Sequence, residues 1–126
     1  MKLASLELRN PTMNASGICS SYPDLLKRWE RAGVGAVITK AIRMEESSGY
    51  KNPVMIEPYP GAILNCMGFP GPDYKHSLDE LREYEFEVPL IIQIYGKDED
   101  EFGFLIKQSE EIADAFELNV SCPHAK

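Results

Sequence analysis

The chain has 126 residues, which is enough for a single globular domain with its own core. Its composition, 44% hydrophobic and 26% charged, excludes an intrinsically disordered chain, and a formal net charge of -7 disfavours a nucleic-acid partner. No apolar run approaches the length of a membrane span, and the first residues lack the apolar block of a signal peptide, so we expect a cytoplasmic protein. Cys19, Cys66 and Cys122 lack the paired spacing of zinc sites and disulfide frameworks, so we expect no metal.

Four apolar, β-branched segments predict buried parallel strands. In chain order they are residues 11–17, 36–42, 89–96 and 116–122. An amphipathic stretch of helical spacing lies between each segment and the next. The alternation predicts an α/β fold in which right-handed crossovers build a parallel sheet.

Each of the three predicted helices has an apolar stripe and a signal for its start or end. The first follows Ser-Ser-Tyr-Pro-Asp at 20–24 and ends at Gly33, which suits a left-handed C-terminal stop. The second has a capping box in which Ser77 precedes Glu80 by three residues. The third opens with acidic residues, which suit the helix dipole, and its apolar face continues to Ala113.

Residues 43–75 interrupt this alternation. They hold five of the nine prolines and four of the nine glycines of the chain. A loop of this length inside a compact domain is usually functional or disordered. Its apolar residues favour an ordered excursion that carries function.

Polar or ionisable residues stand at the carboxyl end of every predicted strand. They are Ser16 with Gly17, Thr39 with Lys40, Gln93, and Asn119 with Cys122. Ligands of parallel α/β folds and barrels bind at these ends, so the pattern predicts a site there.

Each of these residues also has a purely structural interpretation. Lys40 suits an anionic ligand, but a lysine that ends a strand often only reaches solvent. Cys122 is either a small buried hydrophobe or an accessible thiolate that accepts a proton. Asn65 either closes an Asx-turn or binds the edge of a planar heterocycle.

Four motifs together resemble the dihydroorotate dehydrogenase family, in particular its FMN-dependent class 1 enzymes of the 1B type. They are NPTMNASG at 10–17, GAVITKAI at 35–42, LNCMGFPG at 64–71 and ELNVSCP at 117–123. The resemblance implies that residues 1–126 form the N-terminal half of a (β/α)8 TIM barrel, with strands one to four and the long Pro/Gly-rich loop after strand two. The C-terminal half of the barrel, which would carry the flavin-phosphate site, is missing from this sequence.

The resemblance also assigns roles to individual residues of this chain. Flavin contacts are implied for Ala15, Ser16, Gly17, Lys40, Ala41, Gln93 and Asn119, with Gln93 standing where the family usually has Asn. Substrate contacts are implied for Lys40, Asn65, Cys66, Met67, Gly68, Phe69 and Asn119. The implied catalytic residues are Cys122 and Lys40.

The activity implied by the resemblance is oxidation of dihydroorotate to orotate in de novo pyrimidine (UMP) biosynthesis. Cys122 would take the C5 proton while a hydride passes from C6 to the flavin, and Lys40 would stabilise negative charge near the reduced flavin. The implied partners are a second copy of the protein and an iron–sulfur flavoprotein subunit that passes electrons to NAD.

Three other functions stay open. His124 replaces an Asn found in many family members and resembles relatives of dihydropyrimidine dehydrogenase, which reduce uracil and thymine. A barrel aldolase or lyase without FMN would use Lys40 as a Schiff-base amine. A noncatalytic half barrel would dimerise or serve as an assembly module.

Overall fold

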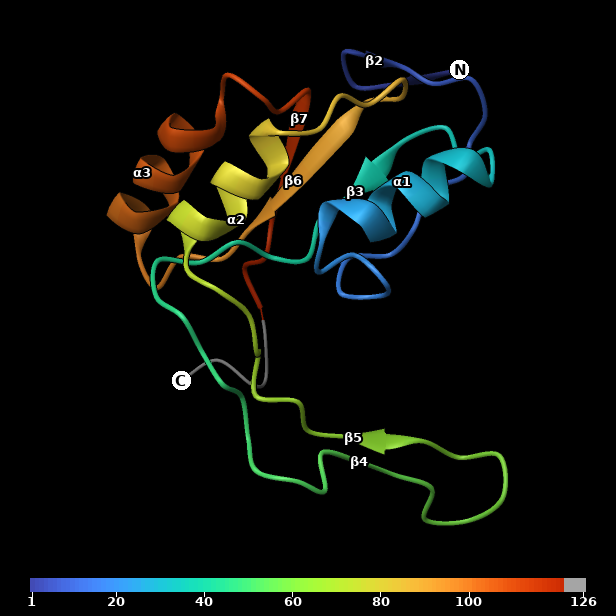
Figure 1. Ribbon diagram of the computed structural model, residues 1–126, viewed down its shortest axis with the longest axis vertical. Helices are drawn as coiled ribbons and strands as arrows, with labels where there is room; N and C mark the ends of the chain where they lie inside the picture. The colour runs from blue at the N-terminus through green and yellow to red at the C-terminus, as the bar shows by residue number, and fades with distance from the viewer. Residues whose placement is uncertain (122–126) are drawn as a thin grey trace.

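A parallel sheet forms the centre of the computed structural model, which describes residues 1–121 (Figure 1). Its strands are β3 (Val37–Ile38), β6 (Leu90–Ile94) and β7 (Ala115–Leu118), hydrogen-bonded in the order β3-β6-β7 with both pairs parallel. A single parallel bridge from Met13 to Ala36 adds the N-terminal segment beside β3. The chain therefore has the predicted mixed α/β fold with a parallel sheet.

Within these residues three helices alternate with the strands, each with local signals at its ends. Helix α1 (Pro23–Arg31) has Pro23 in its first turn and is followed by Gly33, whose φ of +95° is the predicted left-handed stop. Helix α2 (Tyr74–Arg82) is capped by Asp73, and helix α3 (Glu99–Ser109) by Asp98. In both caps the aspartate side chain accepts a backbone N–H of the first turn.

All three helices pack against the same face of the sheet. One buried cluster joins helix residues to alternate strand residues: Leu26, Leu78, Leu81, Leu105, Val37, Leu90, Ile92 and Ile94. The opposite face forms a second cluster with the N-terminal segment: Ala36, Ile38, Ile91, Leu6 and Leu8. A sheet whose helices lie on one face only is singly wound, as barrels are, whereas doubly wound folds cover both faces.

An antiparallel hairpin precedes the sheet and was not predicted from the sequence. Strand β1 (Lys2–Leu3) pairs with β2 (Leu6–Glu7) through Ala4, which has a positive φ of 50°. Leu6 and Leu8 pack this hairpin against the face of the sheet opposite the helices.

Of the strand predicted over 11–17 the structure has one parallel bridge, from Met13 to Ala36, because a side chain takes the place of further backbone pairing. Asn14 is buried, its Nδ2 donates to the carbonyl of Ile38 at 2.8 Å, and its Oδ1 accepts the Ile38 N–H at 2.9 Å. The Asn14 amide thus satisfies both backbone groups of Ile38, so the segment keeps one bridge and remains free to turn.

The other predicted strands are shorter in the structure. The segment 36–42 gives β3 and an isolated bridge from Ile42 to Ile94, and the segment 116–122 gives β7. The predicted capping box at Ser77 is wrong. Helix α2 begins earlier, and the Ser77 hydroxyl donates to the carbonyl of Asp73 at 2.8 Å.

The excursion between β3 and α2 carries a small antiparallel hairpin, β4 (Met55–Ile56) with β5 (Leu64–Asn65). The hairpin projects away from the sheet and its helices (Figure 1). The two arms of the excursion meet where Ser47 and Gly71 exchange backbone hydrogen bonds of 2.9 Å each. The apolar side chains exposed on the hairpin are Met55, Ile56, Tyr59, Ile63 and Leu64.

Candidate functional site

A cavity of about 380 Å³ opens at the carboxyl ends of the parallel strands. It is bounded by the turn after Met13, the ends of β3, β6 and β7, and the base of the excursion. The lining residues are Ser16, Gly17, Ile18, Lys40, Ala41, Asn65, Met67, Phe69, Pro70, Gln93 and Asn119. The ends of three parallel strands, the turn after Met13 and one loop therefore meet at a single site, as expected for a parallel fold.

The turn at 15–20 is shaped by short-range hydrogen bonds. The Gly17 N–H donates to the Ser20 hydroxyl at 2.9 Å, and the Ile18 N–H donates to the Ala15 carbonyl at 3.1 Å. The Ser20 carbonyl then accepts the Lys40 N–H at 2.9 Å, which fastens the turn to the end of β3. Gly17 has a φ of +80°, and a Cβ placed on it would meet nothing within 4 Å, so open space lies beside its backbone.

A polar network joins the turn after Met13 to the ends of β3, β6 and β7. The Ser16 hydroxyl lies 2.7 Å from both the Thr39 carbonyl and Gln93 Oε1, and its single proton can serve one acceptor at a time. Gln93 Nε2 donates to the Glu117 carboxylate of β7, and the Thr39 hydroxyl accepts the Gln93 N–H at 3.1 Å. Glu117 thus takes the N–H side of the Gln93 amide and leaves its oxygen toward Ser16.

Lys40 supplies the positive charge of the site. No carboxylate within residues 1–121 forms an ion pair with it. Burial lowers the pKa of the Lys40 ammonium below its ordinary value, because the charged form loses hydration without gaining a counter-charge. An anion, or a group that gains negative charge during a reaction, would supply the missing counter-charge.

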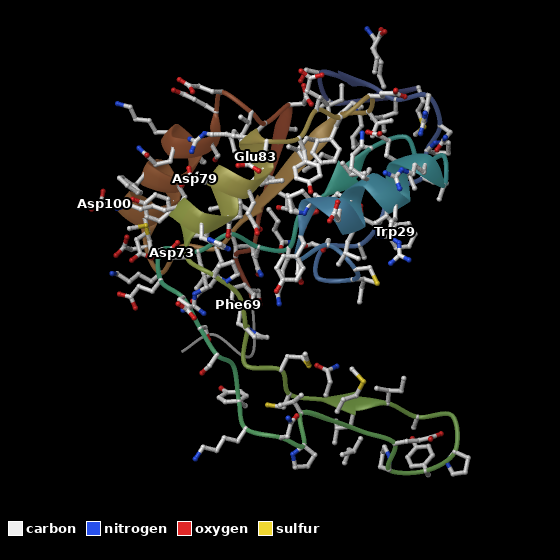
Figure 2. The ribbon with its side chains drawn as sticks, in the orientation of Figure 1. Trp29, Phe69, Asp73, Asp79, Glu83 and Asp100 are labelled. Carbon is white, nitrogen blue, oxygen red and sulfur yellow. The ribbon has the colours of Figure 1, made fainter. Side chains whose placement is uncertain are left out.

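The base of the excursion contributes the fourth wall. Asn65 ends β5, and Met67, Phe69 and Pro70 follow it. Phe69 has a positive φ of 59°, directly after Gly68 with a φ of +70°. Figure 2 shows Phe69 where the projecting hairpin joins the body of the molecule.

Nine of the residues singled out from the sequence line this cavity. They are Ser16, Gly17, Lys40, Ala41, Asn65, Met67, Phe69, Gln93 and Asn119.

Three of the other residues singled out do not line it in the structure. Cys66 is exposed, and its N–H donates to the Val54 carbonyl at 2.8 Å, while Gly68 lines a neighbouring cavity. Ala15 is exposed in the turn. Cys122 lies outside the described residues.

Sequence reasoning missed Ile18, Pro70 and Glu117 as parts of the site. Glu117 could have been predicted from the sequence, because side chains alternate along a strand and Glu117 stands two residues before Asn119, so both side chains lie on the same face. Within residues 1–121 no group of three or more His, Cys, Asp or Glu side chains is placed to hold a metal ion. In the same range no helix is both long and apolar enough to cross a membrane.

Comparison with known families gives one match over the whole chain. The family model described as "Dihydroorotate dehydrogenase" matches residues 1–126.

Curated relatives carry the same family name. Over 126 residues the chain is 44% identical to a Pyrococcus abyssi protein, covering 100% of this chain and 42% of the relative. It is 43% identical to a Methanocaldococcus jannaschii protein and 36% identical to an Archaeoglobus fulgidus protein, covering 42% of each. All three are named dihydroorotate dehydrogenase B (NAD(+)), catalytic subunit. The chain thus spans about two fifths of the length of these relatives.

Proposed function

The chain belongs to the dihydroorotate dehydrogenase family, and we propose that it is the N-terminal half of an FMN-dependent enzyme that oxidises dihydroorotate to orotate. The observation that carries the proposal is the convergence on a single cavity of eight residues from the four motifs, together with Gln93. These residues are far apart in the sequence, so a chance match of short motifs would not bring them together.

A flat flavin ring fits the residues that line the cavity. Space is open beside Gly17, and the Lys40 ammonium together with the amides of Gln93 and Asn119 supplies groups complementary to ring carbonyl oxygens and N–H groups. We propose that Ser16, Lys40, Gln93 and Asn119 hold the FMN ring. The resemblance implies a phosphate site on later strands of the barrel, which we include in the proposal.

The pyrimidine would lie over the same ring, against the base of the excursion. Asn65, Asn119 and Lys40 all line this cavity. The two Asn amides would bind the carbonyl and N–H edges of dihydroorotate, and the Lys40 ammonium would bind its carboxylate or offset charge on the flavin.

Oxidation of dihydroorotate breaks the C5–H and C6–H bonds and forms the C5=C6 double bond. We assign removal of the C5 proton to the Cys122 thiolate, three residues after Asn119 in the chain. When bound, FMN supplies the two-electron acceptor for the C6 hydride. Lys40 stabilises the negative charge that develops as electrons leave the substrate.

The rest of the barrel is part of the proposal. A (β/α)8 barrel takes about 250 residues, and the parallel sheet with its helices on one face supports the proposal that this chain forms the first part of one. The name "catalytic subunit" of the relatives implies a second subunit in those proteins. For this protein we propose a homodimer that binds an iron–sulfur flavoprotein subunit, and this subunit passes electrons to NAD.

Anaerobic titration of the purified whole protein tests the function. We expect a yellow protein whose visible flavin absorbance bleaches with dihydroorotate and not with dihydrouracil. The Cys122→Ser protein should keep its flavin and bleach more slowly at neutral pH, because a hydroxyl is a poorer proton acceptor than a thiolate.

Three results would contradict the proposal. A colourless protein would remove FMN from it. Bleaching by dihydrouracil alone would assign the protein to the dihydropyrimidine dehydrogenase type. Trapping of a carbonyl substrate on Lys40 by borohydride would favour the aldolase or lyase function.

A further inference from the structure

Phe69 has a backbone conformation that a bulky residue rarely adopts. Its φ of 59° lies in the left-handed region, where the Cβ atom of a side chain crowds the backbone. Gly68 before it has a φ of +70°, so the chain makes a left-handed turn of two residues at the wall of the cavity. Such a conformation persists only where its surroundings hold it.

Two side chains hold Phe69 from the side of the sheet. Arg43 Nη1 donates to the Phe69 carbonyl at 3.5 Å, and the guanidinium carbon lies 5.6 Å from the centre of the Phe69 ring. The Tyr95 ring meets the Phe69 ring edge to face, with centroids 5.2 Å apart and planes at 65°.

The sheet fixes both of these side chains. Ile42 and Ile94 form a parallel bridge, and the Tyr95 N–H donates to the Ile42 carbonyl at 2.9 Å. Arg43 and Tyr95 each follow one member of this bridged pair. They therefore lie side by side, directly after the bridged ends of two neighbouring strand segments.

Packing alone does not hold Phe69 in place. A second cavity, of about 340 Å³, lies on the other side of the loop and is lined by Gly68, Arg43 and Tyr95 among others. Phe69 lines the first cavity, so this part of the loop separates the two hollows. Without Arg43 and Tyr95, Phe69 would have room to leave the left-handed conformation.

Arg43 has no other strong interaction in the part of the chain that the structure describes. It forms no ion pair within residues 1–121, and its Nε is buried without a hydrogen-bond partner. Its contacts with the Phe69 carbonyl and ring are therefore its main interactions in that range.

We propose that Arg43 and Tyr95 are positioning residues, which clamp Phe69 in its left-handed conformation and so set the shape of the substrate wall that includes Asn65 and Met67. The inference rests on the proposed function, because it takes the substrate to be a planar pyrimidine. Neither side chain reaches the first cavity, so the clamp acts on the loop and not on the reacting atoms.

Steady-state kinetics of the flavin-loaded whole protein test the clamp. In Arg43→Ala we expect the KM for dihydroorotate and the Kd for orotate to rise about five- to twentyfold, with kcat and flavin content near those of the wild type. Arg43→Lys should recover part of the loss, because an ammonium keeps the cation over the ring. Tyr95→Phe keeps the ring contact, so its KM and Kd should rise far less than those of Tyr95→Ala. Arg28→Ala, on the exposed face of α1, is the matched control.

A double-mutant cycle separates the clamp from general destabilisation. Glycine adopts a positive φ without strain, so Arg43→Ala should cause little further rise in KM in a Phe69→Gly background. An unchanged KM in Arg43→Ala, a parallel loss of flavin, or an equal rise in both backgrounds would overturn the clamp. A wild-type protein that fails to oxidise dihydroorotate would instead overturn the proposed function.

Discussion

At the scale of single residues, Lys40 is the point where binding and stability oppose each other. Its ammonium is partly buried beside the cavity, and no acidic partner stands near enough to pair with it in residues 1–121. Such a charge costs stability in the free protein and becomes favourable when an anionic group binds. The arrangement is typical of residues kept for function.

We predict that Lys40→Met weakens flavin or orotate binding about ten- to a hundredfold while leaving the protein slightly more stable at neutral pH. The pKa of Lys40 is lowered by burial, so between its folded-state pKa and the ordinary 10.5 the unfolded state binds more protons. The free energy of unfolding of the wild type therefore rises with pH across that window. The amount by which it falls short of that of Lys40→Met should decrease over the same window. Denaturant titrations at several pH values measure this, with exposed Lys107→Met as control.

If the difference in free energy of unfolding between Lys40→Met and the wild type is constant with pH, Lys40 is not desolvated in the folded protein.

The residues of the site were largely predictable from the sequence, because strand ends and motif residues mark them. What could not be predicted is how they are joined. Gln93 was expected to face a ligand, and in the structure its amide is also fixed by Glu117 and Ser16. Contacts of this kind depend on the register of β6 against β7, which pairs Gln93 with Glu117 and which no local pattern contains.

At the scale of elements, a buried carboxylate fastens α1 to the segment that leads into β6. Glu30 is buried at the end of α1, pairs with Lys27, and accepts the Glu87 N–H at 2.8 Å. Burial acts to raise the pKa of Glu30, but the hydrogen bonds from Lys27 and Glu87 and the charges of Lys27 and Arg9 outweigh it and lower the pKa. The interaction therefore stabilises the folded state in its ionised form.

We predict that Glu30→Gln lowers the free energy of unfolding by about 1–3 kcal/mol at neutral pH. Because the folded-state pKa lies below the ordinary 4.5, this stabilisation is complete above that pH and is lost as the pH falls through the folded-state pKa. The wild type and the variant should therefore converge in acid. Urea titrations at neutral and acidic pH measure the difference.

The matched control is Glu111→Gln, an exposed carboxylate expected to change stability by less than about 0.5 kcal/mol. Equal effects of the two substitutions, or a Glu30→Gln effect that does not change with pH, would contradict this role for Glu30.

Among the elements, helices were predicted better than strands. Apolar spacing identified all three helices, but the cap of α2 was misplaced, since Ser77 with Glu80 matches a capping box while Asp73 provides the cap. The segment 11–17 matches a strand in composition, yet the buried Asn14 side chain takes over its backbone pairing. In both cases a side-chain to backbone hydrogen bond overrides the local pattern, and only the packed fold determines which one forms.

At the scale of the whole molecule, a parallel sheet carries its helices on one face and the cavity at one end. Helices cover its outer face, the β1–β2 hairpin covers one end of the inner face, and the cavity lies at the carboxyl ends of the strands. Within residues 1–121, β7 pairs with β6 and no strand pairs with its other edge. In the whole barrel that we propose, further strands would pair with this edge.

A crystal structure of the whole protein with FMN and orotate bound would test whether the cavity at the strand ends is the flavin site. We predict the flavin ring in this cavity, in contact with Ser16, Lys40 and Gln93, and the pyrimidine between the ring and Asn65. A flavin bound elsewhere, or a cavity filled by side chains of the remaining half, would contradict it.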